Sequence, residues 1–466
     1  MFSLLNAQAL LGVLLILAAS WALSEDRKRF PWRLAIGAIA LQAVLVLLLF
    51  GIPQSQLLLN GMSGGVNGLA AATRKGTQFV FGYLGGGDQP YAVANSNALF
   101  VFAFEVLPLI LVISALSALL WHWHILRWII RGFGIVFQRT MGLGGASALA
   151  VAANIFLGTV EAPIVIRGYL ERLSRSELFL LMTVGLATVA GSTMVAYATL
   201  LAPTLPDAAG HVLTASIIAA PAGVLLSRIF VPEKLGQGGA YADYTSALSY
   251  DSSIDAIARG ITDGLAVVLN ITATLIVFVA LVALVNVILG AFPDVAGAPL
   301  SVERILGLVF SPLAWAIGVP WSEAGQAGSL LGVKMVLTEF TAYIQLAQIP
   351  AGEMSERTRT ILTYALCGFA NIGSVGIVVA GLGTLVPTRR AEVLDLVWRA
   401  LAAGFLATCL SAAVVGALPE QLFRDGPAAE RTTPVPPARP GATPEAGANA
   451  PPVDAGPAQA PAEPAQ

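Results

Sequence analysis

The composition of this 466-residue sequence excludes an ordinary water-soluble protein. Hydrophobic residues make up 56% and charged residues 11%, with a mean hydropathy of +0.78, whereas a typical globular protein is about 25% charged. The formal net charge of −2 provides no broad basic surface, so we expect no nucleic-acid partner. Two cysteines and three histidines form neither a disulfide framework nor a metal-ligand pattern. The sequence therefore predicts a membrane protein.

Apolar runs long enough to cross the bilayer recur along the chain and predict an all-α polytopic protein with about eight transmembrane helices. Arg27, Lys28 and Arg29 follow the first run, and by the positive-inside rule the N-terminus lies outside. Arg357 and Arg359 would also lie outside, against that rule. The expected spans cover residues 3–23, 33–52, 97–120, 177–203, 211–231, 264–291, 357–386 and 391–417.

Three other segments mix aromatic, charged and apolar residues in the manner of helices that lie in the headgroup region. They are residues 121–140, 249–262 and 301–318. The last residues, 425–466, are rich in Pro, Ala and Gly and have little to bury, so we expect a disordered tail there.

These features, with the hairpins described next, divide the chain into six expected parts. They are the N-terminal transmembrane helices (1–96), a scaffold helix with an interfacial helix (97–140), a first repeat (141–234), interfacial helices with a long scaffold span (235–318), a second repeat with the last span (319–424), and the tail (425–466).

Two segments, 152–170 and 332–346, are too polar and too short for ordinary spans, and each carries a carboxylate, Glu161 or Glu339. A charge at membrane depth costs at least about 2.5–3.5 kcal/mol on insertion scales, so it normally faces a cavity or a partner. Pro163 would also break a straight helix. A re-entrant hairpin with its tip buried in protein accommodates both features.

An apolar span with polar interruptions follows each hairpin, LATVAGST at 186–193 and CGFANIGS at 367–374. The two glutamates are 178 residues apart, and Ser192 and Ser374 are 182 apart. This near-constant offset indicates an internal repeat of hairpin and broken helix, which is typical of a transporter's midplane site. The alternatives are that the small residues serve helix packing and that the carboxylates are structural.

Several of these motifs resemble those of the concentrative nucleoside transporter family. The run NIFLGTVEAPIVIRGYL is similar to the first-hairpin pattern N-x-F-x-G-Q-(T/S)-E-A-P, VLTEFTAY to N-E-F-x-A-Y, and CGFANIGS to C-G-F-A-N. The resemblance covers roughly residues 97–417. It implies two re-entrant hairpins in an inverted repeat, with interfacial helices, assembled as a homotrimer in the lipid of the bacterial inner membrane.

The resemblance also implies a secondary transporter rather than an enzyme, importing nucleosides by symport with Na⁺ or H⁺ through elevator-like movement of a transport domain. No other cofactor and no catalytic residue is implied. The implied base contacts are Gly158, Thr159, Val160, Glu161 and Thr193. The implied ribose contacts are Glu339, Asn371 and Ser374, with Phe369 packing nearby. A sodium ion would bind Asn154, Thr188 and the carbonyls of Leu157 and Val189.

The departures from the family patterns fall mainly among the base contacts. Thr159 replaces the usual Gln, Val160 replaces Thr or Ser, and Thr338 replaces the Asn of the second hairpin. They leave open whether a purine, pyrimidine or modified nucleoside is preferred. Na⁺ and H⁺ coupling also remain open, as does another polar solute. A membrane-embedded hydrolase using the two glutamates is disfavoured, because no nucleophile–base or metal pattern accompanies them.

Overall fold

The computed structural model describes residues 3–51, 53–91, 101–159, 161–205, 207–233, 248–295, 297, 299–350, 352–419 and 421–424. No β-strand occurs in these ranges, and the predicted all-α class is confirmed. The expected tail, 425–466, and Val160 lie outside the described residues.

Seven helices in the described ranges are long and apolar enough to cross a membrane, or eight when one bent pair is included. A helix satisfies its own backbone groups, which lipid requires. These helices coincide with all the predicted spans except 357–386. They are α1 (Leu4–Ala22), α2 (Trp32–Gly51), α4 with α5 (Phe102–Glu105 and Leu107–His122), α9 with α10 (Arg175–Ala187 and Gly191–Leu201), α11 (Ala208–Phe230), α12 (Ser253–Leu289), and η4 with α18 (Pro387–Arg389 and Arg390–Ala417).

One predicted boundary is wrong, and one helix was not predicted. The segments 249–262 and 264–291 form one continuous helix, α12, because no Pro or glycine-rich turn interrupts them. The predicted span 357–386 is interrupted at the expected break, which divides it into α16 (Glu356–Leu366) and α17 (Ile372–Leu385). The helix α3 (Pro53–Phe81) was not predicted, because its Gln, Asn and Gly residues interrupt any long apolar run.

Both predicted segments with a central carboxylate form hairpins, but the hairpins begin earlier than expected. In hairpin 1, α7 (Gly145–Phe156) leads to the tip and α8 (Glu161–Val165) leaves it; in hairpin 2 these arms are α14 (Trp321–Val336) and α15 (Glu339–Gln348). The starts of the first arms gave no clear signal, because α7 begins with small residues and α14 mixes Glu323, Gln326 and Ser329 with small residues. The predicted interfacial segment 301–318 is α13 (Val302–Ala316), bent from α14 by 117°.

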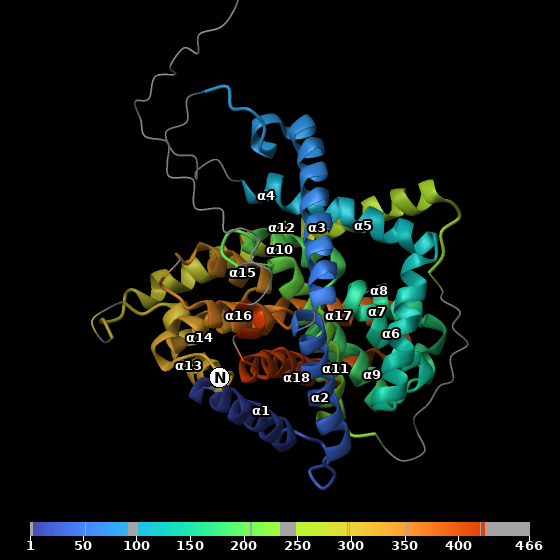
Figure 1. The fold of residues 1–466 in the computed structure, drawn as a ribbon, viewed down its shortest axis with the longest axis vertical. Helices are drawn as coiled ribbons and strands as arrows, with labels where there is room; N and C mark the ends of the chain where they lie inside the picture. Colours follow the sequence, from blue (N-terminus) through green and yellow to red (C-terminus); the bar gives the residue numbers. More distant parts are fainter. Residues whose placement is uncertain are drawn as a thin grey trace, which may run out of the picture. The chain divides into compact units, whose positions relative to one another are not determined.

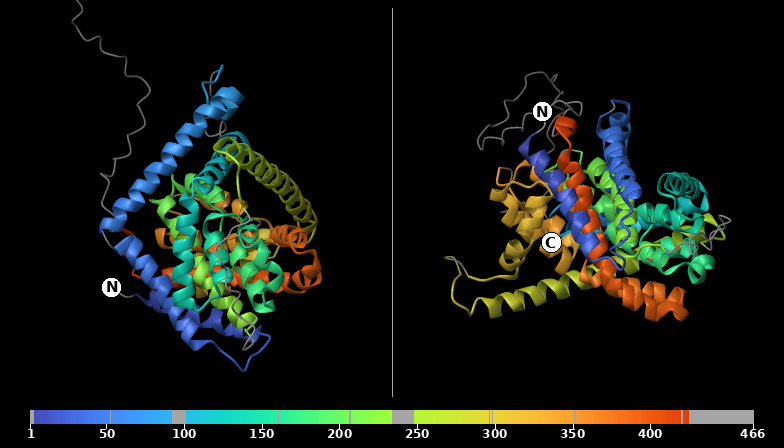
Figure 2. Two further views of the ribbon diagram at one scale, coloured as in Figure 1. Left: turned by 90° about the vertical axis from the view of Figure 1, so that its right-hand side faces the viewer. Right: turned by 90° about the horizontal axis from the view of Figure 1, so that it is seen from below.

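The two hairpins pack in a reciprocal way. Each first arm packs within its own repeat, α7 against α9 and α14 against α16, whereas each second arm crosses to the other repeat, α8 against α17 and α15 against α10. Helices α11 and α18 pack against each other between the hairpins (Figure 1). The helix α12 lies on the outside of the bundle against α5 (Figure 2). The remaining elements are η1 (Gly82–Gly85), α6 (Ile125–Met141), η3 (Arg167–Arg172) and α19 (Gln421–Arg424).

The buried positions of Arg357 and Arg359 explain why they contradict the positive-inside rule. Arg357 donates to the carbonyls of Gly318 and Gly416, at 3.2 and 2.7 Å. Arg359 donates to three carbonyls at the end of α15, those of Leu346, Ile349 and Pro350. Both guanidinium groups therefore satisfy backbone carbonyls inside the protein and carry no topological information.

Candidate functional site

The two helix breaks predicted in the sequence contact each other. The first break lies between α9 and α10 and the second between α16 and α17. The amide of Phe369, in the second, donates to the carbonyl of Thr188, in the first, at 3.4 Å. A Cβ at Gly368 would lie 2.6 Å from the carbonyl oxygen of Ala187. The glycine of the CGFAN motif is therefore required by the close approach of the two breaks.

A buried carboxyl group lies beside these breaks. Glu339 is the first residue of α15 and is 3% exposed. Its Oε1 accepts from the hydroxyl of Tyr197 on α10, and its Oε2 accepts from the amide of Asn371, both at 2.8 Å. An acidic residue in the first turn of a helix is favoured by the helix dipole. The group therefore joins the hairpin 2 tip to the broken helices of both repeats.

Asn371 extends this group to the start of α17. Its side chain caps that helix, since Asn371 Oδ1 accepts from the amide and the hydroxyl of Ser374 at 2.8 and 3.1 Å. Phe369 is half-buried two residues earlier in the break. The predicted ribose contacts, Glu339, Asn371 and Ser374, are thus brought together into one hydrogen-bonded cluster, which we call the Glu339 cluster and which also includes Tyr197.

The predicted base contacts form a second group at the tip of hairpin 1. Glu161 accepts from the backbone amide of Gly158. The hydroxyl of Thr159 donates to the carbonyl of Gly185 on α9 at 2.9 Å. Thr193 is buried, and its hydroxyl donates to the carbonyl of Ala190. Among the described residues no hydrogen bond joins this tip to the Glu339 cluster, although α8 packs against α17, which carries Ser374.

The predicted sodium ligands lie where two helices end, at the C-termini of α7 and α9. The nitrogen of the Asn154 amide donates to Ala150, whereas the buried Asn154 Oδ1 has no hydrogen-bond partner among the described residues. Leu157 and Thr188 are the extended C-caps of the two helices. The carbonyl of Val189 accepts from Ser216 at 3.3 Å. Helix C-termini and neutral oxygen atoms suit a hard cation, so these residues fit Na⁺.

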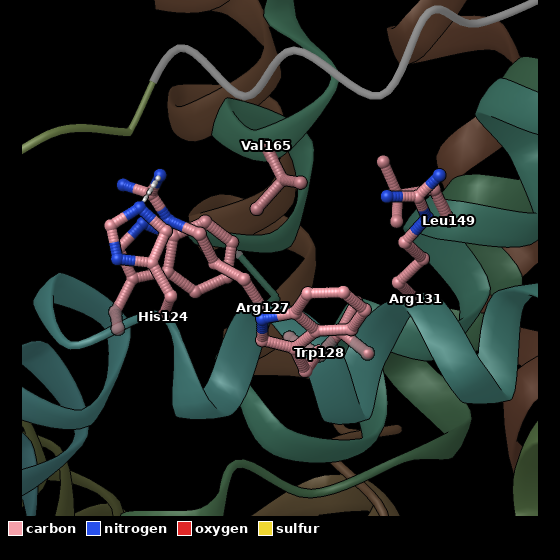
Figure 3. Close-up of a pocket in the computed structure, with 8 residues that line it drawn as sticks. His124, Arg127, Trp128, Arg131, Leu149 and Val165 are labelled. Atoms are coloured by element: carbon pink, nitrogen blue, oxygen red, sulfur yellow. Dashed lines mark hydrogen bonds between the residues drawn. The ribbon is translucent and has the colours of Figure 1, made fainter.

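A surface pocket of about 240 Å³ lies between α6 and the arms of hairpin 1 (Figure 3). The pocket contains neither glutamate. His124, assigned to the headgroup region by the sequence, is exposed and contacts Arg127 at 3.3 Å. The lining residues are Trp121, His124, Arg127, Trp128, Ile130, Arg131, Leu149 and Val165. We do not assign the substrate to this pocket.

Sequence reasoning missed Tyr197 and left Thr338 unexplained. Tyr197 lies one helical turn after Thr193 on α10, and this spacing is the signal that could have identified it. Thr338 is the N-cap of α15, and its hydroxyl accepts from the amide of Thr341 at 3.2 Å. Since Asn and Thr are both favoured N-caps, Thr338 keeps the capping function at a position where the pattern usually has Asn.

Comparisons with known proteins cover most of the chain. Residues 11–84 and 211–416 match models of the N-terminus and the C-terminus of Na⁺ dependent nucleoside transporters, and residues 103–204 match a nucleoside recognition (gate) model. The uncharacterized transporter YutK of Bacillus subtilis is 39% identical over 411 residues, which are 87% of this chain and 98% of that protein. The nucleoside permease NupC of Helicobacter pylori is 35% identical over 414 residues, covering 88% and 96%.

The fold also matches solved structures. The structure of CNTnw in an inward-facing substrate-bound state has a TM-score of 0.80 and 37% identity, and the match covers 90% of this chain and 98% of that one. The structure of a doubly substituted CNTnw in an outward-facing state has a TM-score of 0.79 and 36% identity, with the same coverage.

Proposed function

This chain belongs to the concentrative nucleoside transporter family, and we infer that it imports nucleosides by symport with Na⁺. The comparisons confirm the predicted family, its transport rather than enzymatic character, and a multi-pass location in the bacterial inner membrane. The substrate, the coupling ion and the residues that bind them are our proposals.

The observation that carries the proposal is the Glu339 cluster. Glu339, Asn371 and Ser374 supply a carboxyl group, an amide and a hydroxyl at the meeting point of two broken helices. A carboxylate accepts two hydrogen bonds from neighbouring hydroxyl groups, and charge-assisted bonds are about twice as strong as neutral ones. The 2′- and 3′-hydroxyls of ribose provide such a pair. We assign ribose binding to these three residues, with Phe369 packing against the sugar.

We assign the base to the hairpin 1 tip, to Gly158, Thr159, Val160 and Glu161, together with Thr193. The Thr159 hydroxyl hydrogen is directed to Gly185, and Val160 has no polar side chain. Compared with the family's Gln and Thr or Ser, these residues present fewer hydrogen-bonding groups to a base. This favours purine or modified nucleosides as a second candidate substrate class.

We assign the coupling ion to Asn154 and Thr188, with the carbonyls of Leu157 and Val189. The Asn154 Oδ1, which has no partner within the described part of the chain, supports this assignment, because a buried acceptor without a donor is costly. An ion at this position would connect the hairpin 1 tip to the first helix break, so that ion binding and base binding depend on the same segment. Proton coupling is the competing outcome.

We assign the movement to the two repeats, 141–234 and 319–424, as a transport domain, against a scaffold that includes 97–140 and 235–318. The reciprocal packing of the hairpins supports movement of both repeats as one body. CNTnw has been solved in inward-facing and outward-facing states, which supports an elevator-like cycle here. The exposed apolar side chains of α12, such as Leu269 and Ile276, support contacts with lipid and with other subunits of a homotrimer.

The test is uptake into proteoliposomes that contain the purified protein. Labelled uridine and adenosine are supplied with an inward Na⁺ gradient, with a matched choline gradient, or with an inward proton gradient. We expect Na⁺-driven accumulation of a nucleoside that is recovered unchanged. Recovery of free base would indicate a hydrolase. Accumulation driven only by the proton gradient would show that the coupling ion is H⁺ and not Na⁺. Absence of uptake of both nucleosides would reject the proposed substrate class.

A further inference from the structure

The first arms of the two hairpins end in the same way. The helix α7 ends at Phe156 and α14 ends at Val336, and each is followed by a leucine as its C-cap. Asn154 and Lys334 therefore occupy equivalent positions, each two residues before the end of its helix. Each arm packs against the first half of the broken helix of its own repeat, α9 or α16. The two side chains thus face equivalent surroundings, the C-terminal turn of a broken helix.

In the first repeat this position offers an acceptor. The Asn154 Oδ1 atom lies 3.4 Å from where a Cβ of Gly185 would lie, which places it beside the last turn of α9. It is buried and has no hydrogen-bond partner among the described residues. The carbonyl ends of two helices and this oxygen attract a cation.

In the second repeat the same position supplies a cation. The Lys334 Nζ donates to the carbonyl of Ala365, in the last turn of α16, and to the hydroxyl oxygen of Thr408 on α18, both at 2.7 Å. Thr408 donates its own hydrogen to the carbonyl of Phe405, so it is an acceptor toward the lysine. The ring of Phe405 lies 5.4 Å away. Neutral oxygen atoms at a helix C-terminus therefore surround the amino group, as they would surround a bound Na⁺.

The environment of Lys334 is unusual for a lysine. The side chain is fully buried, at 0% exposure, and no carboxylate within the described ranges forms a salt bridge with it. A buried charge normally requires a partner of opposite charge. Here the direct contacts are the end of a helix, a hydroxyl oxygen and an aromatic face, and the Glu339 carboxyl group interacts electrostatically with the amino group without a salt bridge.

We propose that Lys334 is a tethered cation that replaces, in the second repeat, the mobile cation of the first. Its ammonium group holds α14, α16 and α18 together at the second helix break. The Glu339 cluster is then assembled at all times, and only the hairpin 1 tip depends on a bound ion. Lys334 is a positioning residue, and one mobile cation suffices for each cycle. The comparison with the first repeat rests on the proposed sodium site at Asn154.

Replacing the tethered cation tests this proposal. Purified Lys334→Asn and Lys334→Met proteins in lipid nanodiscs are compared with the native protein and with Lys75→Met, which changes an exposed lysine of α3. Equilibrium binding of labelled uridine and adenosine is measured over a range of NaCl concentrations, with choline chloride keeping the ionic strength constant. Asn at 334 supplies the acceptor found in the first repeat, whereas Met keeps a similar side-chain length without a charge or an oxygen acceptor.

We expect Lys334→Asn to weaken nucleoside binding by about 10-fold at a sodium concentration that saturates the native protein, within the range of coupled sites. Higher sodium should restore binding, and the Hill slope for sodium should rise from about one toward about two, since a second ion is now required. Nucleoside binding by Lys334→Met should be weakened as well and should not recover at higher sodium concentrations. Native binding in both variants, or equal weakening with an unchanged slope, would overturn the proposal and leave Lys334 as a packing residue.

The reciprocal variant, Asn154→Lys, decides the question if the Lys334 variants do not fold. A lysine at 154 should supply a tethered cation to the first repeat, so nucleoside binding should no longer depend on sodium. A folded Asn154→Lys protein that still requires sodium, or that no longer binds nucleoside, would contradict the equivalence. Failure of the proposed coupling ion is seen separately, as sodium-independent binding in the native protein. In that case, a sodium requirement acquired by Lys334→Asn would still support the tethered cation.

Discussion

The hydroxyl of Tyr197 donates to Glu339 Oε1 at 2.8 Å, so a side chain of the first repeat holds the hairpin-tip carboxyl group of the second. The other oxygen, Oε2, accepts from Asn371 of its own repeat. The proposed ribose site is therefore shared by the two repeats. Hairpin 2 cannot separate from α10 without breaking this bond, which is consistent with the two repeats moving as one body.

Tyr197→Phe tests the contribution of this bond to substrate binding. The ring stacks on Tyr343 at 4.5 Å and packs edge-on against Phe340 at 4.8 Å, and Phe preserves both contacts. Loss of a hydrogen bond to a carboxyl group costs about 1.5–3 kcal/mol. We therefore expect the nucleoside concentration that gives half-maximal uptake to rise by about 10-fold or more. Tyr364→Phe is the matched control, because its buried hydroxyl bonds His211 instead. Equal effects of the two substitutions would argue against a specific role for Tyr197.

Glu339→Gln should abolish uptake while the protein remains folded and keeps the oligomeric state of the native protein. The amide keeps the shape of the carboxyl group but directs an NH₂ group toward one of its two donors, and it loses the charge that strengthens bonds to ribose. We expect uptake to fall by about 100-fold or more, since two bonds of about 1.5–3 kcal/mol each are affected. Glu171→Gln, at an exposed position, is the control. Near-native transport by Glu339→Gln across a range of substrate concentrations would rule out the ribose assignment.

Asn154→Ala should raise the sodium concentration that gives half-maximal uptake. The change removes the buried oxygen that we assign to the ion and that has no partner in the portion of the chain the structure describes. We expect an increase of about 10-fold, as is common for coupled sites. Because linkage is reciprocal, nucleoside should also tighten sodium binding less than it does in the native protein. Asn270→Ala, an exposed amide of α12, is the control. Unchanged sodium activation of Asn154→Ala would direct the search to another ion site or to protons.

Features that depend on hydropathy and on local chemistry could be predicted from the sequence. Most spans were recognised because lipid requires long apolar helices, and the two hairpin tips because Glu161 and Glu339 are charged groups in apolar surroundings. The near-constant spacing of the repeats is reproduced by the helices, since α8 and α15 begin 178 residues apart at these glutamates.

Features that depend on tertiary packing could not be predicted. The spacing from Thr193 places Tyr197 on the same face of α10, but it does not identify Glu339, 142 positions away, as its partner. The need for glycine at 368 likewise follows only from the close approach of Ala187. The helix α3 lacks the apolar run on which the span prediction depends. Lys334 did carry a signal, as a charged residue near the tip of a hairpin arm, but its partners on α16 and α18 lie 31 and 74 residues away in the chain.

Thr159→Gln combined with Val160→Thr restores the usual family pattern at the hairpin 1 tip and should shift preference toward uridine or cytidine. The native Thr159 hydroxyl donates to Gly185, and its methyl group lies where a Cβ of Gly185 would clash, so the native side chain packs against α9. Gln is longer and adds an amide that bonds a base edge in both directions, while Thr at 160 adds a hydroxyl. A net hydrogen bond is worth about 0.5–1.5 kcal/mol, so we expect the uridine-to-adenosine ratio in competition assays to change by about 3- to 10-fold.

The double variant and the native protein are compared at matched expression, with Thr199→Gln, a substitution farther along α10, as the control. An unchanged ratio would mean that Thr159 and Val160 only pack the tip, and Glu161 and Thr193 would be the next residues to test.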